Sequence, residues 1–401
     1  MIDPVEIRLQ GVGTCERIEL DNGVIRLVAA PGLGGRVLSV RHRGREHLYR
    51  NPRLLDEDLR PVEGVALGPV DGPMSAWNNV GGDKTWPAPQ GWDGPEEWAG
   101  PPDPVLDSGH YAAETASAPD GSVTLTLTSA DDPRSGLRLR RRLTLEPGAA
   151  GYRLDLEALN VSDTVRRWAL WNVTQIDGAP GARRDTGGVF VGVEGDGPHT
   201  VELVAGNGNP RVEEHTPRVM RVPSPEVVGK VGFPTASGWL AHVGAAGTLT
   251  QRFDVSEGAD YPDSGSRAEV WSEVPVERPL EHLGGLCPVD RVTEVEALGP
   301  LTELAPGERA TLGIEVGFGA GTEAVTEVTP DGFWSEPPHW VGFDSGGGRL
   351  AGAFTALRSG ALVHRASGHI VAQAEPGEST RWASPVPGAD EHTATDVEFV
   401  P

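Results

Sequence analysis

The chain has 401 residues, of which 38% are hydrophobic, and this is enough to build a core. The length fits one large β domain with a small appendage. The formal net charge of −24 repels phosphate, which excludes nucleic acid and anionic membrane surfaces as partners and leaves neutral or cationic ones.

The cysteines and the N-terminal residues indicate the cellular compartment of the protein. Only Cys15 and Cys287 occur, too few for a disulfide framework or a multi-cysteine metal site. Residues 1–6 lack the basic and apolar regions of a signal peptide, and no apolar run approaches the length of a membrane span. We therefore expect a cytoplasmic protein. The histidines show no metal-ligand spacing and no nucleotide-binding motif occurs, so we expect no metal and no cofactor.

The predicted elements are strands along the whole chain, because apolar and polar residues alternate with period two and helical periodicity hardly appears. The first two strands, at 18–20 and 24–28, flank the hairpin turn at 21–23. Further strands are predicted at 37–40, 47–49, 123–127, 137–145, 152–158, 168–175, 189–193, 238–243, 249–253, 268–272, 292–298 and 310–318. The fold class is therefore predicted to be all-β, with half-buried antiparallel strands.

The composition changes near residue 320. We expect a linker at 321–339, because this range is rich in Gly, Thr, Glu and Pro. Several short strands follow it, which predicts a small accessory β module at 340–401.

The long segment 77–111 holds the most polar and aromatic stretch of the chain, and it is too rich in Gly and Pro to be predicted as regular structure. Residues 79–90 read NVGGDKTWPAPQ. The apolar faces of a sugar ring stack on indoles while its hydroxyls take directional hydrogen bonds, so this segment predicts a sugar site. Its tryptophans could instead plug the edge of a core. The candidate substrate-binding residues are Trp77, Asn78, Asn79, Asp83, Trp86, Gln90, Trp98 and Asp107, and Trp92 lies among them.

Two side chains of this segment are candidate proton donors. The chain contains only two lysines, Lys84 and Lys230, and otherwise uses arginine, so Lys84 is a candidate site residue rather than an ordinary surface lysine. His110 lies beside Asp107 and Tyr111, and an imidazole titrates near neutral pH, so it is a candidate acid; the alternative is a capped loop histidine.

Three segments, 20–51, 159–175 and 294–308, together resemble the galactose mutarotase-like superfamily, which includes the aldose 1-epimerases and many carbohydrate-active domains. The resemblance implies a β-supersandwich at 10–320. The GGDKxWPAP loop, together with Tyr261 and Glu269, narrows it to a subgroup of mutarotase-like bacterial proteins and adds both residues to the candidate substrate-binding set.

The resemblance also implies a catalytic arrangement, from which this sequence departs. Aldose 1-epimerases protonate the ring oxygen with two histidines; Val80 stands at the first position, and the middle strand at 170–174 contains no histidine. The base remains: Glu294 and Glu296 project to the same face of one strand. Their repulsion favours an altered proton affinity in at least one of them, although both could simply bind a hydroxyl or an arginine.

The middle strand supplies two further candidates. Trp171 and Gln175 share one face of it. By analogy with the superfamily's histidine position, Trp171 is expected to stack on the ligand, with core packing as the alternative.

These observations leave three functions open. The first is a sugar-acting isomerase, in which Glu294 or Glu296 removes a proton and Lys84 or His110 returns one. The second is a non-catalytic protein that binds or senses a sugar. The third is a lyase or glycoside hydrolase, since same-face strand neighbours lie ~6.6 Å apart and inverting hydrolases separate their carboxylates by ~6.5–9.5 Å. In each case the ligand is a sugar or an oligosaccharide.

Overall fold

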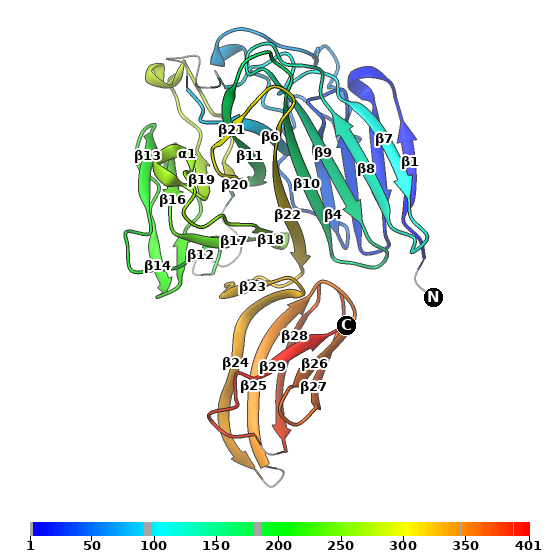
Figure 1. Cartoon of the computed structure of the whole chain (residues 1–401), viewed down its shortest axis with the longest axis vertical. Coiled ribbons are helices and arrows are strands. Elements are labelled where there is room, and N and C mark those ends of the chain that lie inside the picture. The colour runs from blue at the N-terminus through cyan, green and yellow to red at the C-terminus, as the bar shows by residue number, and fades with distance from the viewer. Residues whose placement is uncertain (1–2, 92–97, 99, 180–185, 345–346, 388) are drawn as a thin grey trace.

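The computed structural model describes residues 3–91, 98, 100–179, 186–344, 347–387 and 389–401. Its named strands pair in antiparallel fashion, which confirms the all-β prediction. In Figure 1 two large sheets lie in the upper part of the molecule, and the C-terminal strands form a separate body below them. None of the helices among these residues is long and apolar enough to cross a membrane.

The first sheet contains the strands that carry the site. Its order is β1 (Glu6–Gln10), β2 (Arg17–Asp21), β3 (Ile25–Ala30), β4 (Arg36–His42), β6 (Asp83–Ala88), β11 (Arg166–Asp177), β20 (Val292–Leu298), β19 (Ala268–Glu273), β16 (Gly229–Phe233) and β13 (Val201–Ala205). Two short strands lie beside it, β5 (Arg45–Glu46) next to β4 and β21 (Thr302–Leu304) next to β11.

The second sheet has the order β14 (Glu213–Thr216), β15 (Val219–Val222), β12 (Gly188–Val193), β17 (Ala236–Gly244), β18 (Gly247–Phe253), β22 (Arg309–Gly319), β10 (Gly151–Asn160), β9 (Leu137–Leu145), β8 (Val123–Thr128) and β7 (Ala112–Ser117). In the described part of the chain, four short helices connect the strands: η1 (Gly13–Cys15), η2 (Met74–Ala76), α1 (Pro262–Gly265) and η3 (Glu281–Leu283).

The core of this part forms because the alternating strands bury one face each. In β10, Leu154 and Leu156 are buried while Arg153 is exposed and Asp155 is half-buried. Burial of one such leucine contributes ~1.5–3 kcal/mol. These side chains belong to one continuous core together with residues of the first sheet, so the two sheets pack face to face.

A polar cluster also lies between the two sheets. Arg141 of β9 pairs with Asp83 of β6, and both side chains are fully buried. Asp83 also accepts hydrogen bonds from Asn172 Nδ2 at 2.8 Å and Thr174 Oγ1 at 2.6 Å. Gln251 Nε2 of β18 donates to Thr174 Oγ1 at 2.6 Å. This inner cluster ties β6 and β11 to the second sheet.

The C-terminal part of the chain forms two small sheets, and their strands begin inside the range that the sequence analysis expected as a linker. Its sheets are β23 (Glu327–Thr329), β24 (Gly332–Asp344), β25 (Gly347–Ala356) and β28 (Ser379–Val386), and β27 (His369–Ala374), β26 (Gly360–His364) and β29 (Val397–Val400). The range expected as a linker, 321–339, therefore contains β23 and most of β24. Phe333 and Trp334 explain the difference, because both are buried despite their Gly- and Pro-rich surroundings.

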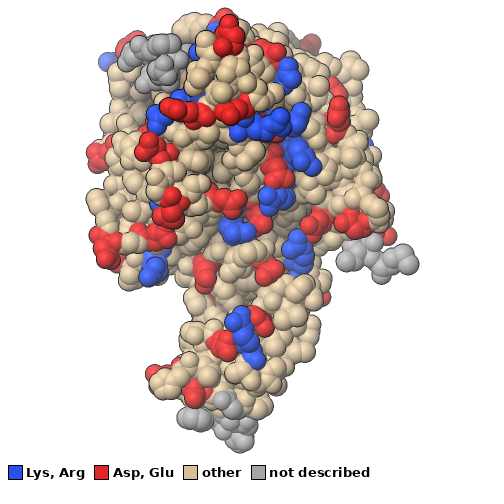
Figure 2. Space-filling model, viewed as in Figure 1, with Lys and Arg blue, Asp and Glu red and all other residues tan. Residues whose placement is uncertain are grey.

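The module is joined to the sandwich by packing and by ion pairs. Phe333 packs in a cluster with Phe190 of β12. Arg358 Nη2 lies 2.8 Å from Glu146 Oε2, and Arg43 pairs with Glu378. Figure 2 shows acidic side chains spread over this face of the molecule with basic ones among them, as the net charge implies.

Candidate functional site

Five neighbouring strands of the first sheet carry charged and aromatic side chains on one face. Lys84 of β6 lies opposite Val173 of β11, which lies opposite Glu296 of β20. Residues two apart in a strand share a face, so the register defines the whole set. The side chains that project from this face are Lys84, Trp86, Trp171, Gln175, Glu294, Glu296, Glu269, Trp271, Glu273 and Lys230.

Two glycines bring β6 into this position. Gly81 and Gly82 have φ angles of 92° and 85°, a region that favours glycine. A Cβ atom at Gly81 would lie 2.2 Å from the carbonyl oxygen of Tyr49, and one at Gly82 would lie 2.3 Å from that of Val37. The close approach of the two backbones therefore requires glycine at both positions.

A cavity of about 370 Å³ lies over this face. This volume falls within the ~300–1,000 Å³ typical of small-molecule sites. The ring centroid of Trp86 lies 5.3 Å from that of Trp171 and 6.2 Å from that of Trp77, so indoles form a continuous wall. The residues that line the cavity are Met74, Trp77, Trp86, Gln90, Pro101, Trp171, Leu203, Val204, Lys230, Asp263, Ser264, Trp271, Glu273, Leu283, Leu286 and Glu294.

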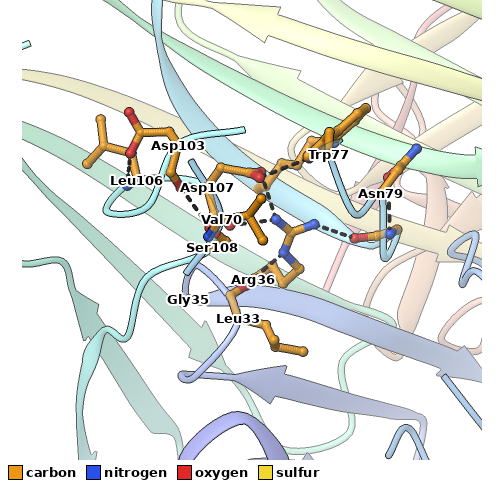
Figure 3. Close-up of polar contacts among 12 residues, drawn as sticks. Leu33, Gly35, Arg36, Val70, Trp77, Asn79, Asp103, Leu106, Asp107 and Ser108 are labelled. Carbon is orange, nitrogen blue, oxygen red and sulfur yellow. Dashed lines mark hydrogen bonds and ion pairs between the residues drawn. The ribbon is translucent and has the colours of Figure 1, made fainter. Parts of the chain in front are cut away.

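A buried ion pair holds Trp77 in the wall, as Figure 3 shows. Asp107 Oδ2 accepts a hydrogen bond from Trp77 Nε1 at 2.9 Å, and its Oδ1 lies 2.8 Å from Arg36 Nη2. Arg36 also donates to the carbonyl oxygens of Leu33 and Gly81, at 2.7 and 3.1 Å. Asp107, predicted to bind the ligand, therefore lies behind Trp77 and positions it.

Glu294 lies between an amide and an ammonium group. Its Oε1 accepts a hydrogen bond from Gln175 Nε2 at 2.5 Å and lies 3.5 Å from Lys84 Nζ. The ammonium group of Lys84 also lies 4.3 Å from the ring centroid of Trp86 and 4.9 Å from that of Trp77. Burial lowers the pKa of Lys84, and the carboxylate of Glu294 opposes this effect.

Glu296 and Glu269 share the second lysine. Lys230 Nζ donates to Glu269 Oε2 at 2.7 Å and to Glu296 Oε2 at 2.8 Å. Glu296 Oε2 also accepts a hydrogen bond from Trp171 Nε1 at 2.6 Å. Burial raises the pKa of both carboxyls, and Lys230 opposes the rise. Glu296 is fully buried beneath the cavity wall, where it holds Trp171 and Lys230 in place.

Glu273 is a carboxyl of the cavity wall that is suited to carry a proton at neutral pH. It lies at the end of β19, lines the cavity and is 7% exposed. Its Oε1 accepts a hydrogen bond from Trp271 Nε1 at 3.1 Å. Burial, together with the nearby carboxylate of Glu294, raises the pKa of Glu273 to about 7. The cavity thus presents a carboxyl that can carry a proton, Glu273, together with a second carboxyl, Glu294, and this pairing suits acid and base roles.

A second cavity, of about 500 Å³, adjoins the first. The two share Met74, Trp77, Glu273 and Leu286 in their walls. Asn78 and Asn79, predicted to bind the substrate, line this second cavity.

The structure brings most of the predicted residues to one place. The cavity wall and the layer directly beneath it contain Trp77, Lys84, Trp86, Gln90, Trp171, Gln175, Glu269, Glu294 and Glu296. Among the residues that the structure describes, no group of three or more His, Cys, Asp or Glu side chains could hold a metal ion.

Asp83 and His110 do not reach the cavity. Asp83 points to the opposite face of β6, because it is adjacent to Lys84 in a strand, and belongs to the inner cluster with Arg141. His110 has a 58% exposed side chain on the outer surface, where its Nε2 lies 3.3 Å from Glu16 Oε2. The neighbouring Tyr111 is fully buried and anchors the segment, which leaves His110 outside.

Trp98 and Tyr261 are supporting residues. Trp98 is buried with its ring centroid 5.1 Å from that of Trp86, and its Nε1 donates to Asp103 Oδ2 at 3.2 Å. Tyr261 accepts a hydrogen bond from the Ser256 backbone N–H at 2.9 Å. Trp92 lies outside the described residues.

The sequence analysis missed Glu273, Trp271 and Lys230. Glu269, Trp271 and Glu273 alternate with period two, so the one predicted site residue of this strand pointed to the other two. The scarcity of lysine applied to Lys230 as much as to Lys84.

A comparison with known protein families identifies the family of this chain. A family model described as a domain of unknown function (DUF4380) matches residues 15–312, which is more than half of the chain, and the chain therefore belongs to this family. No curated protein matches the sequence.

Solved structures show a likeness of fold. A TPR-domain containing protein from Parabacteroides distasonis is 15% identical, with a TM-score of 0.50, over 75% of this chain and 46% of that protein, so this chain spans less than half of its length. A galactose mutarotase-like protein from Lactobacillus casei is 11% identical, with a TM-score of 0.45, over 75% and 99%. Another from Clostridium acetobutylicum is 10% identical, with a TM-score of 0.41, over 78% and 98%.

Proposed function

We propose that this member of the DUF4380 family binds a sugar ring in the tryptophan-lined cavity and catalyses acid–base chemistry on it, as an isomerase does. Glu294 acts as the base and Glu273 as the acid. The observation that carries the proposal is the pair itself: Glu273 and Glu294 face one cavity, and burial, together with the nearby carboxylate of Glu294, raises the pKa of Glu273 to about 7.

The side chains that line the first cavity support a sugar as the ligand. Trp77, Trp86, Trp171 and Trp271 offer aromatic faces for the C–H groups of a pyranose ring. The amide of Gln90 and the carboxyls offer donors and acceptors for hydroxyl groups. Hydrogen bonds to the hydroxyl groups of the sugar inside such a cavity fix the orientation of the ring and add to its affinity.

The reaction follows from the two carboxyls. Glu294 removes the proton of the anomeric hydroxyl while Glu273 gives a proton to the ring oxygen, the bond between the ring oxygen and the anomeric carbon breaks, and an open-chain aldehyde forms. Closure on the other face of the carbonyl reverses these transfers and yields the other anomer. Glu273 thus supplies the acid that the missing histidines would have supplied, and Glu296 positions Trp171 and Lys230.

Polarimetry on freshly dissolved α-D-glucose and α-D-galactose tests the proposal. Glu273→Gln and Glu294→Gln should each lower kcat/KM ~10²–10⁴-fold, the usual worth of general acid or base catalysis. Glu303→Gln, at an exposed position of β21, is the matched control and should have no effect. Because Glu273 must be protonated, activity should fall as the pH rises through about 7, near the pKa of this carboxyl.

Two results would contradict the proposal. Full activity in Glu294→Gln would show that Glu294 is not the base. If no neutral aldose binds, the proposed ligand is wrong. Tight binding without turnover would favour the alternative, a non-catalytic sugar-binding protein, which the missing histidines also favour.

A further inference from the structure

A single sugar ring bound in the first cavity would not occupy the second cavity. Its volume is about 500 Å³, against about 370 Å³ for the first cavity, and the inner walls that carry Glu294 and Trp171 belong to the first cavity alone. A ring held against those walls leaves the second cavity empty. Cavities of this size are typical of ligand sites in their own right.

Part of the wall of the second cavity is polar, and hydrogen bonds hold this part in place. Tyr49 Oη donates to Asp290 Oδ2 at 2.6 Å, and Arg53 Nη1 donates to Asp290 Oδ1 at 3.2 Å. Asn51 Nδ2 donates to the Asn79 carbonyl oxygen at 2.9 Å. These contacts fix the shape of the cavity before any ligand enters.

Asn78 offers an amide group that is free to bind. Asn78 lines the second cavity and is partly exposed, and its side chain makes no hydrogen bond to any residue that the structure describes. An amide carries two N–H donors and one carbonyl acceptor, which match the hydroxyl groups of a sugar.

The two cavities meet at Trp77 and Glu273. Both residues line both cavities. Asp107 fixes the indole of Trp77, so the passage between the cavities has a rigid aromatic side. An extended ligand can therefore pass from one cavity into the other along that indole.

We propose that the substrate is a neutral oligosaccharide, whose reducing-end ring occupies the first cavity and whose next ring occupies the second. This inference rests on the proposed function, which requires a free anomeric centre in the first cavity. Three carboxyls, Asp263, Glu273 and Glu294, and one ammonium group, that of Lys230, line the first cavity, so this excess of carboxyls should disfavour a uronic acid.

Calorimetric titration of the full chain with matched sugars tests this inference. The probes are glucose and galactose, the disaccharides maltose, cellobiose and lactose, and glucuronic acid. At least one disaccharide should bind about tenfold more tightly than its reducing-end monosaccharide, which corresponds to ~1.4 kcal/mol. Glucuronic acid should bind more weakly than glucose.

Substitutions at Asn78 separate the two cavities. Asn78→Trp fills part of the second cavity, so it should abolish the gain for the disaccharide and leave the monosaccharide Kd unchanged. Asn78→Ala should reduce the gain. Asn209→Trp introduces the same bulk at an exposed asparagine outside both cavities and should change neither Kd.

The possible failures are distinguishable. If monosaccharides bind and no disaccharide binds more tightly, the inference is overturned and the proposed function stands. If Asn78→Trp weakens both sugars equally, the second cavity is not a separate subsite and the inference is again overturned. If no sugar binds, both the proposed function and the inference fail.

Discussion

The two faces of the first sheet carry different kinds of polar cluster. On the inner face, Asp83 meets Arg141, so one carboxylate is balanced by one guanidinium. On the cavity face, four carboxyls, Glu269, Glu273, Glu294 and Glu296, meet only two ammonium groups, Lys84 and Lys230. The inner cluster is balanced in charge, and the cavity cluster is not.

The two clusters differ in charge balance, and they do not differ in whether all their buried polar atoms form hydrogen bonds. On the cavity face Lys84 Nζ, Glu269 Oε1 and Glu296 Oε1 are buried without a hydrogen-bond partner, but so are Arg141 Nε and Gln251 Oε1 on the inner face. Burial, together with the neighbouring carboxyls, raises the pKa of Glu269 and Glu273 on the cavity face.

The largest expected effect is on the inner face. Arg141→Met leaves the buried carboxylate of Asp83 without its cation, and breaking such a pair costs ~3–5 kcal/mol in the free energy of unfolding. Denaturant unfolding measures the loss. Arg138→Met, on the same strand but pairing with Asp131 at the surface, is the control and should cost at most ~1 kcal/mol. A loss below 1 kcal/mol in Arg141→Met would mean that the inner pair contributes no more than a surface pair.

On the cavity face the loss should be smaller and should depend on pH. Lys230→Met removes the cation that lowers the pKa of Glu269 and Glu296, so both folded-state pKa values rise further. A raised carboxyl pKa in the folded state makes stability fall as the pH rises above the ordinary carboxyl pKa. The loss should be ~1–3 kcal/mol at pH 8 and smaller at pH 5.

Unfolding experiments at both pH values test this dependence. Arg252→Met removes a cation from a partly exposed pair with Glu315 and should show the same small loss at both. An equal loss in Lys230→Met at pH 5 and pH 8 would show that its two carboxyls do not take up protons in its absence.

The acid of the proposed reaction should respond to a mild change. Trp271→Phe removes the N–H that donates to Glu273, and the loss of a donor to the charged form raises a carboxyl pKa. The alkaline limb of the pH–rate profile should therefore move upward, by at most about one pH unit for one hydrogen bond. If the alkaline limb does not move, the pKa that it reports belongs to a group other than Glu273.

The smallest effect is expected at His110. Its ring is exposed and its one contact is with Glu16, so His110→Ala should change stability by less than about 0.5 kcal/mol. Sugar affinity should not change. A clear loss of affinity would place the ligand outside the cavity described above.

Period-two alternation predicted much of the fold and half of the site. It predicted the strands that carry Trp171, Glu294 and Glu269 and the shared face of Glu294 and Glu296. It was not applied to 83–88, because the Gly and Pro residues of the whole segment 77–111 indicated irregular structure. Asp83 and Lys84 were therefore assigned to one site although neighbouring strand residues point to opposite faces.

The remaining site residues depend on register between strands distant in sequence. Trp271 lies opposite both Glu294 and Lys230, and neither pairing can be read from one sequence. The pKa of Glu273 depends on burial and on the nearby Glu294, which only the folded structure defines. Local patterns thus predict which face a side chain occupies within its strand, and not which strands become neighbours.

The distribution of lysine gives the site a spectroscopic reporter. Lys84 and Lys230 are the only lysines in the chain, and both lie at the cavity. Protein produced with lysine enriched in ¹³C at the ε carbon would give two side-chain resonances, both from this site. Their chemical shifts would follow ligand entry and protonation without any mutation, in a molecule of 401 residues.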